Sequence, residues 1–111
     1  MKAFRFYIGT KAGECAKNTR FKGWTFSKQQ VVEAIECVRI AYNAVTNDFP
    51  KIEGYSLYTI DGYWQGVQET SYVLEIMIDS MDYEALTSGL KEFLKQDSVM
   101  VTVRDCEVEF L

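Results

Sequence analysis

The sequence predicts an α+β fold in which two helices cover one face of a four-stranded antiparallel sheet. Three observations lead to this prediction: four segments alternate as strands do, two have the apolar spacing of amphipathic helices, and their order is strand, helix, strand, strand, helix, strand. With right-handed crossovers, this βαββαβ order fits the ferredoxin-like sandwich with strand order 4-1-3-2. All 111 residues are assigned to this single domain.

The first part of the chain predicts a strand, a long loop and a helix. Residues 3–9 alternate as in a half-buried strand, whereas residues 10–26 have no period and predict a loop. The strand turns three apolar residues to one side, namely Phe4, Phe6 and Ile8. Ser27 and Gln30 fit a capping box that begins a helix ending near residues 47–48. The expected buried face of this helix is Val31, Ile35, Val38, Tyr42 and Val45.

The second part predicts a hairpin followed by another helix. Residues 54–61 and 70–78 are rich in β-branched and aromatic residues, and the two glycines between them favour a hairpin connection at 62–67. A helix is expected to begin near Ser80 or Asp82. Its expected apolar face is Tyr83, Leu86, Leu90, Phe93 and Leu94.

Two local features of this second part need a structural reason. Gly89 lies inside the second helix, where glycine costs about 1 kcal/mol relative to alanine, so it is expected to mark a close approach to the sheet. Residues 99–110 predict one long final strand. Its apolar phase changes across Arg104 and Asp105, and a β-bulge there would keep one face buried.

The sheet face opposite the helices is expected to be too apolar for a fully solvated surface and too charged for a buried core. It should carry Arg5, Tyr7, Val73, Glu75, Met77, Met100, Thr102 and Arg104. A surface this apolar suits either a homo-oligomer interface or a ligand platform, and the oligomer is favoured.

The composition excludes several classes of protein. Hydrophobic residues make up 48% and aromatic residues 14%, too many for a disordered chain. No apolar run is long enough for a membrane span, and Arg5 interrupts what a signal peptide would need, so a cytoplasmic protein is expected. The chain has no histidine, which removes the commonest general base and metal ligand. No metal, cofactor or catalytic residue is therefore predicted, and the protein is expected not to be an enzyme.

The three cysteines are far apart and odd in number, which favours reduced thiols over a disulfide framework or zinc site. Cys37 and Cys106 are expected in the core. Cys15 is expected in the loop near Lys11 and Lys17, where its pKa could be lowered. An incidental exposed thiol is favoured over a nucleophile there, because no base accompanies it.

Charge is distributed unevenly along the chain. Residues 1–28 hold seven basic residues and one acidic residue, a balance of +6, whereas residues 29–111 carry −10. The positive charge gathers in the loop before the first helix, together with aromatic and glycine residues, and helix N-termini favour anions. This pattern predicts a site for a small anionic, phosphorylated ligand. The predicted ligand-binding residues are Lys11, Lys17, Arg20, Lys22, Trp24, Trp64 and Arg104.

A plainer interpretation of this loop stays open, in which Phe21, Trp24 and Phe26 only staple it to the helix. Nucleic-acid binding is not expected: residues 6–9 look like one RNA-recognition motif, but its companion motif is missing on the third strand and the rest of the chain is acidic. Four carboxylates surround the hairpin strands, and a solvated face is favoured over acid–base catalysis for them. They are Asp61, Glu69, Glu75 and Asp79.

The segment 54–71 also carries a resemblance. Its glycines, Trp64 and the return strand beginning Glu69-Thr-Ser71 form a G-x-W…E-x-S hairpin. This hairpin resembles small phage and prophage proteins, clearly so over residues 49–78. The resemblance implies a phage accessory protein and carries over no catalytic residues, because that family has no settled activity.

Two functions are expected on these grounds. The first is a non-enzymatic accessory protein that binds a nucleotide-like ligand in the host cytoplasm and sequesters a defence signal. The alternative is a protein-binding inhibitor of a host enzyme, acting through its acidic surface or open sheet face. Neither function involves a membrane or a nucleic-acid polymer.

Overall fold

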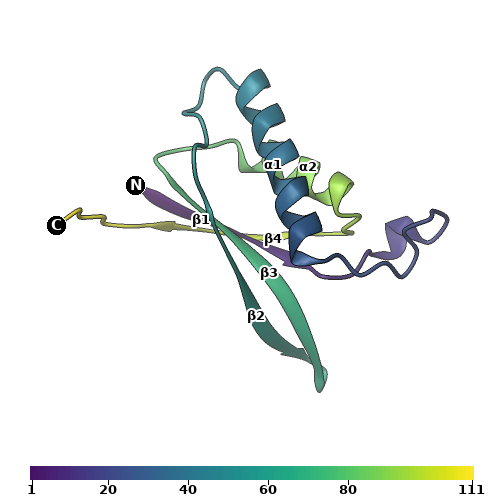
Figure 1. Cartoon of the computed structure of the whole chain (residues 1–111). Coiled ribbons are helices and arrows are strands. Elements are labelled where there is room, and N and C mark those ends of the chain that lie inside the picture. The colour runs from purple at the N-terminus through teal and green to yellow at the C-terminus, as the bar shows by residue number, and fades with distance from the viewer.

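The computed structural model describes the backbone of residues 1–111 and every side chain except that of Trp64. The elements are β1 (Lys2–Gly9), the short 3-10 helix η1 (Glu14–Ala16), α1 (Lys28–Val45), β2 (Ser56–Trp64), β3 (Val67–Ile78), α2 (Tyr83–Phe93) and β4 (Met100–Asp105). The four strands are antiparallel in the order β2-β3-β1-β4, which confirms the predicted topology. Both helices lie on one face of the sheet (Figure 1).

The core lies between that face and the helices. The predicted apolar side of β1 is buried, and Tyr72, Leu74 and Ile76 of β3 join it in register. Helix α1 contributes Val31, Ile35 and Val38 to the same cluster. Removing this apolar surface from water is the main force that holds the helices to the sheet.

The opposite face has no layer over it within the described chain, and its residues are those predicted. Strand register places Arg5 beside Glu75 and Tyr7 beside Val73. The Arg5 Nε lies 2.6 Å from a Glu75 carboxylate oxygen, which raises the pKa of the guanidinium. Val73 is nevertheless fully buried at 0% exposure, with Tyr7 and Tyr58 opposite it on the two neighbouring strands.

Helix α1 begins with the predicted capping box, in which Ser27 and Gln30 exchange side-chain and backbone hydrogen bonds. The expectation that Val45 is buried is wrong: it is 78% exposed, because it lies in the last turn, beyond the end of the core.

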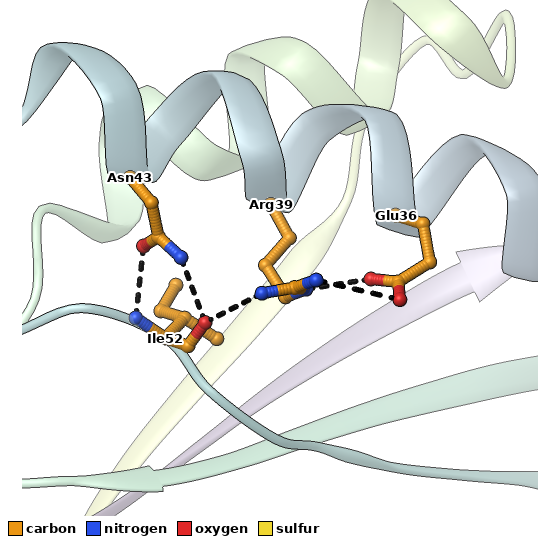
Figure 2. A network of polar contacts seen from close by, with 4 residues as sticks. All are labelled: Glu36, Arg39, Asn43 and Ile52. Atoms are coloured by element: carbon orange, nitrogen blue, oxygen red, sulfur yellow. Dashed lines mark hydrogen bonds and ion pairs between the residues drawn. The ribbon is translucent and has the colours of Figure 1, made fainter.

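The polar side of α1 fastens the loop that follows it. Figure 2 shows Arg39 and Asn43 reaching from the helix to the backbone of Ile52, while Glu36 points toward Arg39. The Asn43 amide accepts from the Ile52 N–H and donates to its carbonyl, both at 2.8 Å. Arg39 donates to the same carbonyl at 3.0 Å and to Glu36. These contacts hold the backbone of the loop in place, and the side chain of Ile52 is buried in the core.

The β2–β3 hairpin is longer than predicted. Its turn consists of Gln65 and Gly66, with φ of 49° and 78°. These two left-handed residues are typical of the tight turns that match the twist of a hairpin. Gly62, expected in the connection, lies within β2 opposite Glu69. The strands therefore continue to the turn and pass the end of β1 (Figure 1).

Helix α2 begins after Asp82, whose carboxylate accepts from the Ala85 N–H. The prediction that Tyr83 and Phe93 belong to the buried apolar face is wrong. They lie at the ends of the helix and are 41% and 51% exposed. Gly89 does mark a close approach, but to α1 and not to the sheet: a Cβ there would lie 2.9 Å from Cγ1 of Val38.

The predicted long last strand is also wrong. Strand β4 ends at Asp105, which is opposite Lys2, the first residue of β1. The Cys106 N–H still donates to the Met1 carbonyl at 2.9 Å, but residues 106–111 form no strand and no bulge is found there (Figure 1). Apolar alternation alone does not make a strand where no neighbour is available.

The cysteines are not core residues. Cys37 is exposed, because it precedes the buried Val38 by one position and so faces away from the core on α1. Cys106 is half-buried in the segment after β4. Cys15 is exposed, as predicted. Neither α1 nor α2 is long and apolar enough to cross a membrane.

A candidate ligand-binding notch

The overhang of the hairpin creates a notch at one end of the sheet. Gly9, the last residue of β1, pairs with Ser71, so residues 67–70 of β3 have no strand beside them on the β1 side within the described chain. The loop leaving β1 turns away at this point, and a hollow of about 500 Å³ remains between the two segments. It is lined by Gly9, Thr10, Lys11, Val67, Gln68, Glu69, Thr70 and Ser71.

Glu69 stands between two gaps. Its partner on β2 is Gly62, which has no side chain, and on its other side β1 has already ended. The carboxylate is exposed, and it shares the open sheet face with Ser71 and Val73 because strand residues alternate between faces. This arrangement leaves room for a ligand directly beside an acidic group.

The notch carries both signs of charge. Lys11 lines the wall formed by the loop, and Glu69 lines the wall formed by the hairpin. Between them are three hydroxyl residues and one amide, belonging to Thr10, Thr70, Ser71 and Gln68. The Thr70 hydroxyl donates to Asp61 at 3.1 Å, so it is already engaged. Such a lining suits a small ligand that carries a cationic and an anionic group together.

Two consecutive residues between α2 and β4 hold the loop wall in place. The buried Gln96 amide binds the backbone of Gly9 and of Lys11. Asp97 accepts from the backbone N–H groups of Cys15 and Glu14 at 2.8 Å each. The Cys15 and Glu14 N–H groups hold the pKa of Asp97 below its ordinary value.

Cys15 is not acidified. Partial desolvation and the neighbouring Asp97 carboxylate raise the pKa of the thiol. The expectation that nearby lysines could lower it is wrong, because a carboxylate and not an ammonium is the group that contacts it. The structure gives no support for a nucleophilic role of this cysteine.

The predicted ligand-binding residues are distributed over several places. Lys11 lies in the notch. Lys17 and Lys22 share a second hollow of about 500 Å³, whose lining also includes the carboxylates of Glu14 and Asp97. Arg104 is opposite Ala3 on the sheet, six strand residues from Gly9 and hence about 20 Å from the notch. The side chain of Trp64 lies outside the described part of the structure.

The aromatic residues of the loop form a cluster of their own. Phe21 stacks on Phe26 at 6.3 Å and meets Trp24 edge-on at 5.9 Å, while the Arg20 guanidinium lies 4.8 Å from the Phe21 ring centre. Phe26 is buried, so this cluster anchors the loop to the core. Trp24 remains 42% exposed and can still meet a ligand.

Sequence reasoning missed most of the notch. The sequence assigns Glu69 to a solvated face and places Ser71 only in the hairpin motif, and it gives Thr70 and Gln96 no role in binding. The available signal was the length of the hairpin: because apolar and β-branched residues continue toward Gly66, strands that outrun residues 3–9 could have been inferred.

No known protein family matches the sequence, and no curated protein sequence does. Several solved structures share the fold, among them the two that follow. One is a phage SAM lyase in its apo state, with a TM-score of 0.59 and 23% identity over 93% of this chain and 78% of the lyase chain. The other is a DUF3240 family protein from Shewanella baltica OS155, with a TM-score of 0.55 and 14% identity over 99% of this chain and 94% of that one. At these identities the likeness establishes the fold.

The likeness to the lyase corrects one prediction. The protein was expected not to be an enzyme because it lacks histidine and recognisable motifs, yet a chain of the same fold is a lyase. Neither argument therefore excludes catalysis in this architecture. The phage resemblance of the hairpin and its motif stay predictions, because no family matches the sequence.

Proposed function

We propose that the protein binds S-adenosylmethionine (SAM) in the notch and cleaves it as a lyase, in the manner of a phage accessory protein. The observation that carries this proposal is the presence of Glu69 and Lys11 in the lining of one hollow of suitable size. The similar fold of a phage SAM lyase supports the choice of substrate class.

The charges of the notch match those of the substrate. SAM carries a positive sulfonium, a positive amino group and a negative carboxylate within a few bonds of one another. Glu69 can oppose the sulfonium, and Lys11 can bind the carboxylate. A charge-assisted hydrogen bond of this kind contributes about 1.5–3 kcal/mol. The two contacts together would orient the substrate.

The size of the notch is also suitable. Its volume of about 500 Å³ falls in the range of small-molecule sites, which is roughly 300–1,000 Å³. The adjoining open face presents Tyr58 and Ile60, which are 39% and 38% exposed and offer an apolar surface for an adenine ring.

The chemistry needs little from the protein. When a C–S bond of a sulfonium breaks, the bonding pair returns to sulfur, which becomes a neutral thioether and a good leaving group. The carbon fragment then completes its valence by losing a proton or by bonding to its own carboxylate oxygen. In the first case Glu69 is the group placed to accept the proton. In both cases the thioether product no longer carries the sulfonium charge, so Glu69 would bind the product more weakly than the substrate.

Calorimetric titration tests the binding. Wild-type protein should bind SAM more tightly than S-adenosylhomocysteine, which has the same shape without the sulfonium charge. Glu69→Gln should weaken SAM binding roughly tenfold or more and remove most of this preference. Glu107→Gln is the control, since it removes the same charge from an exposed residue outside the notch. Equal binding by wild type and Glu69→Gln would reject the proposal.

A second candidate is the predicted phosphorylated ligand at the basic loop. It is favoured by the hollow that Lys17 and Lys22 share, and opposed by the two carboxylates in the same lining. A titration with linear and cyclic nucleotides separates the candidates. Binding that Lys17→Gln and Lys22→Gln abolish, with no binding of SAM, would put this second candidate first.

A further inference from the structure

We infer that Gln96 is a positioning residue for the notch: it holds the loop wall from behind and so controls how tightly the ligand of the proposed function binds. Gln96 is 7% exposed, and it is the one buried polar residue among the side chains that the structure describes. It does not line the notch. It therefore acts through the backbone of residues that do.

Every polar atom of the amide is directed to the backbone. Its Oε1 accepts from the Gly9 N–H at 3.1 Å. Its Nε2 donates to the carbonyls of Lys11 and Leu94, each at 2.9 Å. One side chain thus connects both ends of the segment 9–11 to the end of α2.

Gly9 is the residue that makes this contact possible. A Cβ at position 9 would lie 2.8 Å from Oε1 of Gln96, closer than such atoms approach one another. The amide could not retreat without giving up a hydrogen bond to a buried donor or acceptor. The glycine at the end of β1 and the amide at 96 are therefore matched.

The consequence for the notch is geometric. The two walls belong to different parts of the chain, and the hairpin wall is fixed by its pairing with β2. The loop wall is fixed by Gln96 and by the pairing of Lys11 with Thr25. In an enzyme site, a displacement of about 1 Å can lower the reaction rate a hundredfold. By the same geometric argument, we expect a loosened loop wall to weaken ligand binding.

The chain offers a matched control at a distance. Asn43 binds the backbone of Ile52 in the same way, accepting from its N–H and donating to its carbonyl (Figure 2). Asn43 is sixteen residues along α1 from Ser27, about 24 Å from the end of the helix that follows the loop. It is an amide clamp that does not touch the notch.

The experiment compares apolar replacements of similar size, Gln96→Met and Asn43→Leu, in the full chain. Melting temperature, SAM affinity by calorimetry and hydrogen exchange of residues 9–11 and 51–53 are measured for each. Both variants should lower the melting temperature. Only Gln96→Met should raise the dissociation constant for SAM, by roughly tenfold or more, and speed exchange of the Gly9 N–H.

Two further variants protect the test against misfolding. Gln96→Glu keeps an acceptor for the Gly9 N–H but sets a buried carboxylate against the carbonyls of Lys11 and Leu94, so it should also weaken SAM binding. Gly9→Ala should displace the amide from the other side and weaken binding as well. Loss of affinity in all three variants, with Asn43→Leu unchanged, would not arise from a general loss of stability.

The outcomes are distinct. The inference is overturned if Gln96→Met binds SAM within twofold of wild type, or if Asn43→Leu weakens binding equally. If wild type does not bind SAM at all, the proposed function fails. The exchange rates then decide about Gln96 alone: unchanged exchange at Gly9 and Lys11 in Gln96→Met would show that it does not hold the wall.

Discussion

At the scale of single residues, two acidic side chains near the basic loop have different surroundings. Glu69 lines an open hollow, and the structure gives it no hydrogen-bond partner among the described side chains. Asp97 is engaged by two backbone N–H groups and organises the first turn of η1. Sequence position did not distinguish them, because both occur in polar stretches.

The lowered pKa of Asp97 leads to a prediction about acid stability. A carboxyl whose pKa is lower in the folded than in the unfolded chain stabilises the fold above its ordinary pKa, and this contribution disappears as the pH falls through the folded value. Asp97→Asn should therefore lower the melting temperature at pH 7. The difference from wild type should shrink below about pH 4.

Thermal unfolding followed by circular dichroism at pH 7, 5 and 3 measures this difference. Asp79→Asn is a suitable comparison, because Asp79 is exposed and pairs only with the N-terminal amino group at 3.4 Å. A constant difference between wild type and Asp97→Asn at all three pH values would show that the charge of Asp97 is not what holds the loop.

Residue types led to one residue of the notch. The concentration of positive charge predicts Lys11 as a ligand-binding residue; the structure places it in the lining of the notch, and its binding role stays a prediction. Gln96 was not recognised, because a single glutamine after a helix has no distinguishing pattern. Its role depends on contacts with residues 85 and 87 positions away in the chain, which no local signal encodes.

At the scale of elements, periodicity and capping predicted helices and strands correctly wherever a neighbouring element packs or pairs against them. Helix α1 begins at its capping box, and β1 and β3 pair with their apolar sides together. The errors concern the ends of strands. The β2–β3 hairpin continues past the end of β1, and β4 stops opposite the first residue of β1. Both depend on which strand lies alongside, so tertiary pairing and not local propensity decided them.

Gly89 gives a prediction that separates local from tertiary effects. Alanine in a helix interior is better than glycine by about 1 kcal/mol, but its methyl group would press on Val38 at 2.9 Å. Overpacking of this kind costs about 1–3 kcal/mol. Gly89→Ala should therefore destabilise the wild type and stabilise a Val38→Ala background, where the space is free.

Urea unfolding of the four proteins in this double-mutant cycle gives the answer. An effect of Gly89→Ala with the same sign in both backgrounds would mean that α1 and α2 are not in close contact at this point.

At the scale of the whole molecule, the open sheet face is the largest feature without a partner. Met77 and Met100 are 45% and 59% exposed on this face, beside the Arg5–Glu75 ion pair. An exposed apolar face of this kind favours association of two copies of the chain. The Arg5–Glu75 ion pair on it would fix how the two copies are aligned. The prediction of a homo-oligomer therefore remains in place.

Size-exclusion chromatography with light scattering should give a dimer or larger assembly at about 100 µM, a concentration at which interfaces of standard size are normally formed. Met100→Lys should reduce the assembly to monomer. Ile40→Lys, which changes an equally exposed residue on α1, should not. A monomeric wild type, or dissociation by both variants, would remove the open face as the interface.

The central claim is that the notch binds and cleaves SAM with Glu69 as its essential acidic group. The most direct measurement incubates purified protein with SAM and follows the loss of substrate and the appearance of a thioether by chromatography with mass detection. Wild type should consume SAM, Glu69→Gln should be slower by at least about a hundredfold, and Glu107→Gln should be within twofold of wild type. No consumption by wild type, or equal rates for wild type and Glu69→Gln, would contradict the claim.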